Sequence, residues 1–209
     1  MDFLYIAILL IIILFSMTLH EMAHAFVGFW LGDRTAKEEG RLTINPLAHI
    51  DPFLTILLPL LLLIAGGPIF GGAKPVPFIP HNLKWGEFGA MLVGIIGPIT
   101  NFILACLGVV VLFFVPSYSF AGSIIQLWIS VNLGFFIFNM LPIPPLDGSR
   151  LLYYLAPEPV REIMQTIERY GLIVIFVIVI LFSQQISMFM RAGISFFMSI
   201  FDSILGVVV

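Results

Sequence analysis

The stretch FSMTLHEMAHAFVGFW, residues 15–30, places two histidines and one glutamate inside a long apolar run. The run extends from about residue 3 to residue 31, and about 20 apolar residues suffice for a helix to cross a membrane. Ionisable side chains are costly at membrane depth, and those found there usually serve a function. The stretch therefore predicts a membrane-spanning helix that carries three chemically useful residues.

The composition of the whole chain also indicates a membrane protein. Of its 209 residues, 60% are hydrophobic and 10% are charged, and the mean hydropathy is +1.13. A soluble domain has about 45–50% apolar and about 25% charged residues. The net charge of −3 and the lack of any Lys/Arg run exclude nucleic acid as a partner. Cys106 is the single cysteine, so any metal must be held by nitrogen and oxygen ligands.

The apolar stretches predict an all-α polytopic membrane protein, a bundle of about five to six transmembrane or re-entrant helices in one domain, 1–209. They cover, approximately, residues 3–31, 53–70, 87–115, 120–141, 171–183 and 186–209. The first, third and fourth are long enough to span a membrane. Pro59 and the exit GGPIFGG favour a bent or re-entrant segment at 53–70. The last two stretches are expected to form a helical hairpin over 171–209.

The most polar part of the chain lies between the first two stretches, at residues 32–52. Within it, the side chains of Arg41 to Ile44 alternate in polarity, and Gly40 and the pair Asn45-Pro46 bound this segment. Such a pattern predicts a short strand, and hence a small membrane-associated β element after the first helix. Its edge could accept an unwound peptide as a further strand.

The basic residues predict how the chain is oriented, because Lys and Arg concentrate in cytoplasmic loops. No basic region precedes the first apolar run, which is interpreted as a retained helix rather than a signal peptide. If the 53–70 segment re-enters, eight basic residues all become cytoplasmic; if it spans, they are split between the two faces. The charge favours re-entry, with the N-terminus outside. The eight residues are Arg34, Lys37, Arg41, Lys74, Lys84, Arg150, Arg161 and Arg169.

The residues His20, Glu21 and His24 form the pattern HExxH on the first predicted helix. Histidines at i and i+4 share one helical face, so both imidazoles can bind one zinc ion while the glutamate reaches a metal-bound water. A chance match is the alternative, and the cost of three ionisable residues at membrane depth argues against it. Counted back from Gly32, the histidines lie about 12–18 Å inside the helix end.

Catalytic zinc usually takes three protein ligands and a water, so one further ligand is expected. Asp147 is the best candidate, because it lies in NMLPIPPLDGSRLL (139–152), where prolines and Gly148 break the end of the fourth stretch. Broken backbone at membrane depth is tolerated where it lines a polar site. A turn or capping aspartate is the alternative. In the re-entrant topology, Asp147 and the two histidines lie at the same membrane face and can meet.

Five motifs together, LHEMAH, GRLTINPLAHIDP, GGAKPVP, GPITN and NMLPIPPLDG, resemble the site-2 protease family of intramembrane zinc metalloproteases. The likeness is to the compact bacterial and archaeal form without a PDZ or CBS domain. The resemblance implies that His20, His24 and Asp147 bind one Zn2+ per chain and that Glu21 is the catalytic base. It also implies regulated proteolysis of a membrane-spanning protein substrate in the bilayer of a prokaryotic cell. The charge pattern and the re-entrant topology place the expected active site toward the cytoplasm.

The resemblance further implies substrate binding or transition-state stabilisation for Asn101 and Asn139. A plain hydrogen bond between helices is the alternative for each of them. Gly94 and Gly97 are expected to allow close helix contact, and His49 is interpreted as a loop histidine.

Two other functions remain open from the sequence, a zinc-binding membrane protein without proteolysis, such as a metal carrier, and a catalytically silent scaffold. Carriers usually spread polar ligands along a path through several helices, whereas these ligands gather at one level. The presence of Glu21 and of all three expected ligands argues against the scaffold.

Overall fold

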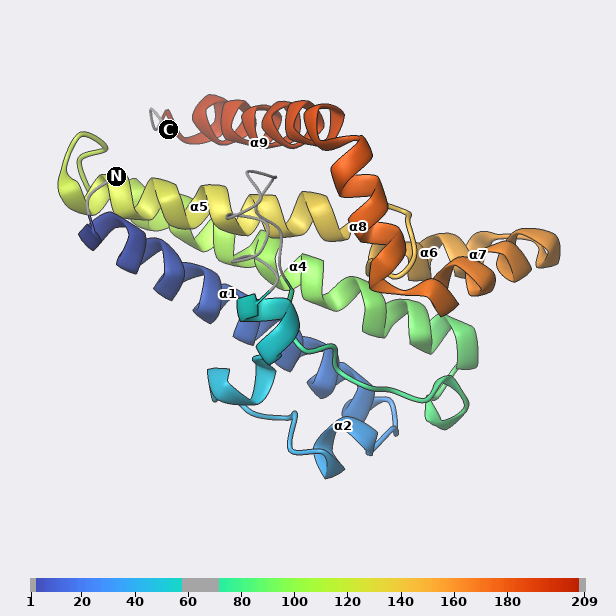
Figure 1. The fold of residues 1–209 in the computed structure, drawn as a ribbon. Coiled ribbons are helices and arrows are strands. Elements are labelled where there is room, and N and C mark those ends of the chain that lie inside the picture. The colour runs from blue at the N-terminus through green and yellow to red at the C-terminus, as the bar shows by residue number, and fades with distance from the viewer. Residues whose placement is uncertain (1–2, 58–71, 207–209) are drawn as a thin grey trace.

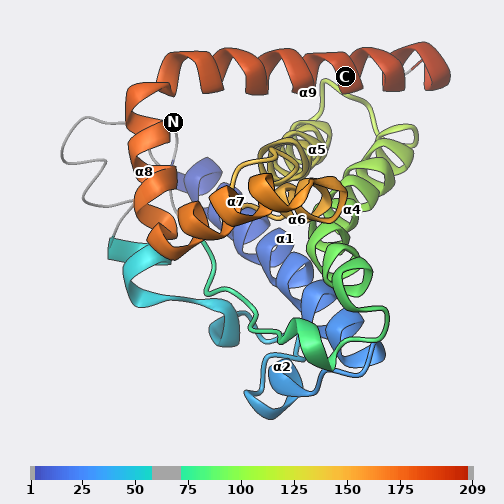
Figure 2. The same cartoon turned by 90° about the vertical axis from the view of Figure 1, so that its right-hand side faces the viewer.

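Three long helices form the centre of the molecule. In the computed structural model, which describes residues 3–57 and 72–206, they are α1 (Phe3–Trp30), α4 (Gly86–Leu112) and α5 (Phe120–Asn139). Each is long and apolar enough to cross a membrane. α4 packs against both α1 and α5, so the three make one bundle (Figures 1 and 2).

Shorter helices surround this bundle, and the all-α class predicted from the sequence is confirmed for the described residues. They are α2 (Thr35–Glu38), the 3-10 helices η1 (Pro46–His49) and η3 (Pro80–Asn82), the π-helix η2 (Pro52–Leu57), α6 (Gly148–Leu155), α7 (Glu158–Tyr170), α8 (Leu172–Leu181) and α9 (Ser183–Leu205). α9 crosses the outer face of α5 (Figures 1 and 2).

The candidate membrane spans in the described residues are α1, α4 and α5, which correspond to the three apolar stretches that the sequence predicts to be long enough to span a membrane. There are three, or four if α7 and α8, which bend by 91° at their junction, form one broken span. α9, the second arm of the expected hairpin, is not among the candidates, because its polar residues lower its hydropathy. Of the segment expected to re-enter, only residues 53–57 are described, within η2; residues 58–71 lie outside the described part.

The main apolar core lies between α4 and α5, and α9 covers it. Val109 of α4 and the residues Ile129 and Leu133 of α5 are almost fully buried there. A Cβ on Gly108 would lie 2.8 Å from Ile129, so glycine at this position lets the two helices approach closely. Because lipid tails are as apolar as leucine, such close packing, rather than exclusion of water, holds helices together in a membrane.

The short strand predicted at Arg41 to Ile44 is wrong, because the structure has a bend there and the described residues contain no strand. The Arg41 side chain is buried, and its guanidinium donates to the carbonyls of Ala48, Lys74 and Pro75. The ring of His49 is buried too and hydrogen-bonds the Thr43 carbonyl. Side-chain hydrogen bonds thus fold the segment onto itself, and four alternating residues are too few to outweigh them.

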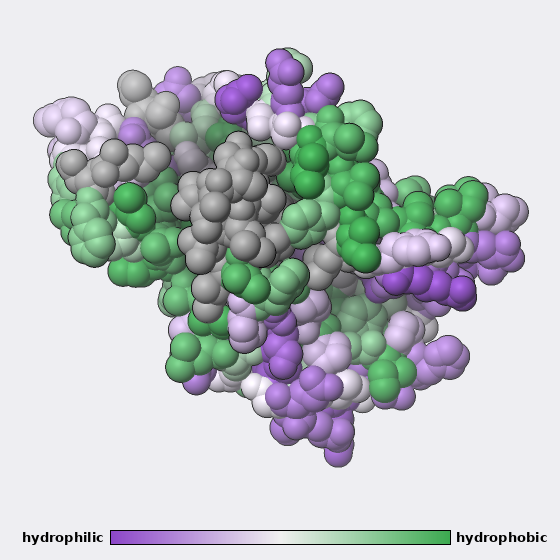
Figure 3. Space-filling view, viewed as in Figure 1, coloured by the Kyte–Doolittle hydropathy of each residue, from purple (hydrophilic) through white to green (hydrophobic). Residues whose placement is uncertain are grey.

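The end of α1 and the start of α4 lie side by side. The Lys84 N–H donates to the Leu31 carbonyl at 2.7 Å, and the side chains of Leu31, Leu83 and Val93 share a second apolar cluster. Both helix ends therefore lie at the same end of the bundle. On the face seen in Figure 3, hydrophilic residues gather there over α2, whereas hydrophobic residues cover α8.

Asp33, in the loop after α1, stabilises this junction between α1 and α4. Its buried carboxylate accepts hydrogen bonds from the Ile79 N–H at 2.6 Å, from the Asn82 amide at 3.1 Å and from the Thr35 hydroxyl at 2.6 Å. Burial by itself raises the pKa of a carboxyl group, but these hydrogen bonds outweigh it and leave the pKa of Asp33 below its usual value.

Candidate metal centre

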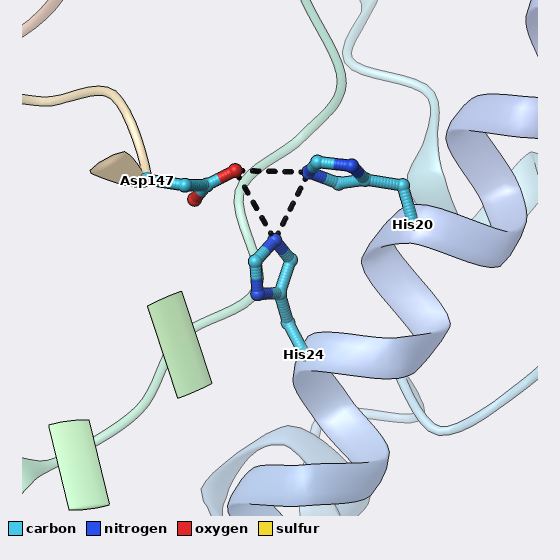
Figure 4. A group of neighbouring side chains, drawn as sticks. All are labelled: His20, His24 and Asp147. Atoms are coloured by element: carbon cyan, nitrogen blue, oxygen red, sulfur yellow. Dashed lines mark hydrogen bonds and ion pairs between the residues drawn. The ribbon is translucent and has the colours of Figure 1, made fainter. Parts of the chain in front are cut away.

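His20 and His24 extend from one face of α1 toward Asp147 (Figure 4). They are one helical turn apart, so their side chains lie one above the other. Only 6% of His20 and 7% of His24 is exposed. The Nε2 atoms of the two imidazoles lie 3.0 Å apart.

Asp147 reaches the same point from the broken segment between α5 and α6. One oxygen of its carboxylate lies 3.0 Å from His20 Nε2 and 3.5 Å from His24 Nε2. Gly148 permits the turn that brings it there, because a Cβ at this position would lie 2.4 Å from the Met140 carbonyl oxygen. The break predicted at this aspartate therefore directs its carboxylate at the two histidines.

The second nitrogen of each imidazole has its own acceptor. His20 Nδ1 lies 2.5 Å from the amide oxygen of Asn101, and His24 Nδ1 lies 2.6 Å from the Val93 carbonyl. Because both acceptors are oxygens, each Nδ1 carries the proton, which leaves the Nε2 lone pairs facing each other and Asp147. Metal-binding histidines are usually oriented by such hydrogen bonds.

Gly94 and Gly97 of α4 allow the close contacts at the metal centre that the sequence predicts. A Cβ on Gly97 would lie 2.3 Å from His24 Nε2 and 2.6 Å from His20 Nε2, so any larger residue would occupy the space between the imidazoles. A Cβ on Gly94 would lie 2.7 Å from the Arg150 side chain and 3.1 Å from the Asp147 carbonyl oxygen. Gly94 thus allows close contact with α6, and Gly97 allows the two imidazoles to converge.

Comparison with known proteins assigns the family. The model of peptidase family M50 matches residues 118–183, which include Asp147. A Bacillus subtilis protein named "Putative zinc metalloprotease YwhC" is 43% identical over 179 residues, covering 81% of this chain and 78% of that protein. The chain belongs to peptidase family M50. A Mycolicibacterium smegmatis protein, "Putative zinc metalloprotease Rip2", is 31% identical over 182 residues, 84% of this chain and 69% of that protein. No solved structure matches.

The donor set of this M50 peptidase fits the zinc ion that both relatives' names state. Three ligands at about 2.0–2.1 Å from a tetrahedral zinc lie about 3.3 Å from one another. The nearest donor atoms of His20, His24 and Asp147 are 3.0, 3.0 and 3.5 Å apart. They form the only group of at least three potential ligands found in residues 3–57 and 72–206. With three apolar helices long enough to span a bilayer, the M50 chain is a membrane protein with a zinc site.

Two further predicted residues, Glu21 and Asn139, are not part of the ligand cluster. Glu21 is buried on α1, directly after His20. Asn139 is half-buried, and its amide donates to the Phe135 carbonyl of its own helix at 3.1 Å. His49, interpreted from the sequence as a loop histidine, lies at the end of the 3-10 helix η1, where its buried ring hydrogen-bonds the Thr43 carbonyl.

One polar residue near the M50 site was missed by the sequence reasoning. Asn132 lies on α5, fully buried, and its amide oxygen accepts a hydrogen bond from the Asn101 amide at 3.0 Å. The signal available was a neutral polar residue within the apolar stretch 120–141, seven residues before Asn139. Its partner could not be read from the sequence, because Asn101 lies on another helix.

Proposed function

We propose that this M50 peptidase is an intramembrane endopeptidase, which cleaves peptide bonds within the membrane-spanning segments of other proteins. One observation carries the proposal: the two histidines and Glu21 are buried within α1, a 28-residue apolar helix. Counted back from Trp30 at 1.5 Å per residue, His24 and His20 lie about 9 and 15 Å inside the helix end. A site at that depth suits a buried segment of a membrane protein better than a soluble loop.

Each residue of the site has a distinct role in this proposal. His20, His24 and Asp147 hold the zinc ion through their facing donor atoms. When bound, the zinc ion lowers the pKa of a water ligand and polarises the carbonyl of the substrate. Glu21 removes a proton from the water as the water oxygen bonds to the carbonyl carbon. Glu21 then gives the proton to the amide nitrogen as the C–N bond breaks, and general acid–base catalysis of this kind contributes about 10²–10⁴ in rate.

The substrate must unwind locally before it can be cut, because the carbonyls of a helix are engaged in hydrogen bonds. An apolar cavity of about 420 Å3, lined by residues of the broken segment, α8 and α9, would suit the side chains of an unwound membrane segment. Its wall includes Ile143 and Leu146 before Asp147, together with Val179 of α8 and Phe189 of α9. Leu146 directly precedes Asp147, so a chain bound at the zinc ion would pass close to this cavity.

The cytoplasmic orientation of the active site belongs to the same proposal. The hydrogen bond between Lys84 and Leu31 supports it, because α1 ends and α4 begins at one end of the bundle. The intervening chain must then return to the face that it left, as the re-entrant topology requires. The basic residues Arg34, Lys37 and Lys84 lie at this end, which the positive-inside rule makes cytoplasmic. The membrane would be that of a prokaryotic cell, because both relatives come from bacteria.

The test is cleavage of a single-span substrate in liposomes by the wild-type chain and by Glu21→Gln. We expect Glu21→Gln to retain zinc and to lose cleavage by about 10²-fold or more, because it keeps the ligands and removes the base. Asp147→Ala is the matched variant, and we expect it to lose zinc as well. Equal product from wild type and Glu21→Gln would contradict the catalytic role. A cut mapped by mass spectrometry to a water-exposed loop would contradict the intramembrane role.

A further inference from the structure

A chain of hydrogen bonds connects the candidate metal centre to the backbone of α5. His20 Nδ1 lies 2.5 Å from Asn101 Oδ1 on α4, and Asn101 Nδ2 lies 3.0 Å from Asn132 Oδ1 on α5. Asn132 Nδ2 in turn donates to the Trp128 carbonyl at 2.9 Å. Both asparagines are fully buried. The series of hydrogen bonds therefore links α1, α4 and α5 through side chains that are buried.

The donors and acceptors in this series of hydrogen bonds determine which way each asparagine amide points. His20 must present the lone pair of Nε2 to a metal, so its proton lies on Nδ1 and Asn101 has to turn its amide oxygen toward it. The amide nitrogen of Asn101 then needs an acceptor, which Asn132 Oδ1 supplies. A second possible acceptor is the Ser16 carbonyl oxygen, which lies 3.5 Å from Asn101 Nδ2. This distance is at the outer limit of a hydrogen bond. Asn132 holds the direction of its own amide by donating to Trp128.

We propose that Asn132 is a positioning residue of the metal centre, which acts through Asn101 to hold the ring orientation and tautomer of His20. A reversed Asn101 amide would turn its N–H groups toward the Nδ1–H of His20, and the ring would lose its acceptor. Asn132 prevents this reversal. Asn101 itself has its oxygen and its nitrogen engaged by protein groups, so it supports the ligand His20 rather than contacting the substrate. The inference rests on the metal centre and not on the choice of substrate.

A purely structural role for Asn132 predicts a different result, because a hydrogen bond between α4 and α5 could serve helix packing alone. In that case, loss of the bond would lower thermal stability and leave the affinity of the folded protein for zinc unchanged. A positioning role requires that zinc affinity falls by more than the loss of packing explains. The two roles are separated by measuring both quantities on one set of variants.

The experiment is a zinc titration of the full chain in detergent against a competing chelator, beside the thermal unfolding midpoint. Asn132→Leu removes the acceptor for Asn101. Asn132→Ser removes it too, but its hydroxyl can still bond the carbonyl one turn back, so the helix is better preserved. We expect about a tenfold loss of zinc affinity in both variants, because groups that orient metal ligands typically contribute 10–100-fold. Asn132→Asp keeps an acceptor oxygen for Asn101 but loses the N–H that donates to the Trp128 carbonyl, so it should recover only part of the affinity.

Leu133→Ala provides the matched control on the same helix. Leu133 is fully buried in the apolar core between α4 and α5, so its truncation should lower the unfolding midpoint without changing zinc affinity. The double variant Asn101→Leu/Asn132→Leu should bind zinc no more weakly than Asn101→Leu alone, because the two residues act in series. Cobalt substituted for zinc should show an altered visible absorption spectrum in Asn132→Ser and an unaltered one in Leu133→Ala.

The outcomes distinguish this inference from the proposed proteolysis. Zinc affinity within about twofold of wild type in Asn132→Ser, or equal losses in Asn132→Ser and Leu133→Ala, would overturn the positioning role. Wild-type zinc affinity does not depend on any substrate, so a failure to find intramembrane cleavage would leave the result for Asn132 standing. If Asn132→Leu does not fold, Asn132→Ser and Asn132→Asp decide the question by themselves.

Discussion

Gly97 of α4 lies against His24 of α1 so closely that a Cβ at position 97 would be 2.3 Å from His24 Nε2. The same Cβ would be 2.6 Å from His20 Nε2. Glycine at this position is therefore a condition for the two imidazoles to converge with Asp147. A methyl group would take the space in which the donor atoms meet.

Gly97→Ala is expected to weaken zinc binding by at least about tenfold, because the imidazoles must rotate away from each other. Gly28→Ala is the matched control, since a Cβ at Gly28 of α1 has no atom within 4 Å. Metal analysis after dialysis should show zinc retained by Gly28→Ala and lost from Gly97→Ala. Full zinc occupancy in Gly97→Ala would mean that α1 and α4 separate more easily than their packing indicates.

Asp33 should make the junction between α1 and α4 sensitive to acid. Its pKa in the folded chain lies below the ordinary value of 3.8, so the unfolded chain binds the proton more readily. The stabilisation is therefore present above about pH 4 and is lost as the pH falls through the lower, folded-state pKa. Thermal unfolding in detergent between pH 6 and pH 3 should show a steeper fall for wild type than for Asp33→Asn.

Asp33→Ala should destabilise the chain at neutral pH by about 1–3 kcal/mol, because the N–H of Ile79 and the amide of Asn82 lose their hydrogen bonds to a charged acceptor. Zinc affinity should stay unchanged, since Asp33 lies in the loop beyond the end of α1 and not in the metal centre. The same pH profile for wild type and Asp33→Asn would show that other carboxyl groups dominate the acid response.

The apolar cavity lined by Leu146 should influence which peptide bonds are cut. Val179 lines the cavity and is buried, whereas Val177 on the same helix is 49% exposed and does not line it. Val179→Phe should narrow the cavity and lower cleavage of substrates with large apolar residues near the cut, relative to substrates with alanine there. Val177→Phe should leave the ratio unchanged. The ratio is measured on paired substrates that differ at one residue, and an equal effect of both variants would argue against the cavity.

The orientation of the chain can be tested with single cysteines introduced after Cys106 has been replaced by alanine. Lys37 lies in α2, at the end where α1 and α4 meet, and Ser117 lies in the connection between α4 and α5. In intact cells, a thiol reagent that does not cross membranes should label Ser117→Cys and not Lys37→Cys. After lysis, both should be labelled. The reverse pattern in intact cells would place the metal centre toward the outside.

Much of the candidate site follows from short-range patterns. The spacing of His20 and His24 places both on one helical face, because an α-helix repeats every 3.6 residues. The prolines and Gly148 predict that the backbone breaks beside Asp147. Both features depend on residues close together in the chain, and the structure has the expected helix and the expected break.

The strand at Arg41 shows where such patterns fail. Alternation over four residues carries little information unless a neighbouring strand pairs with them, and the partners of Arg41 are carbonyls up to 34 residues away. The helices α6 and α7, which follow Asp147 in the structure, were not predicted either. The sequence shows Arg41 and its carbonyl partners but does not indicate that they contact one another.

The sequence by itself determined the membrane helices, the two histidines on one face and the broken segment that carries Asp147, because periodicity and composition act locally. The need for a third ligand and the family resemblance also predicted that Asp147 meets His20, 127 residues away, and the structure brings the two together. Only the tertiary structure decided that His20 meets Asn101, 81 residues away. It also decided that Gly97 leaves the space in which the donor atoms converge and that Asn132 supports Asn101. These contacts join different helices, so they depend on how α1, α4 and α5 pack.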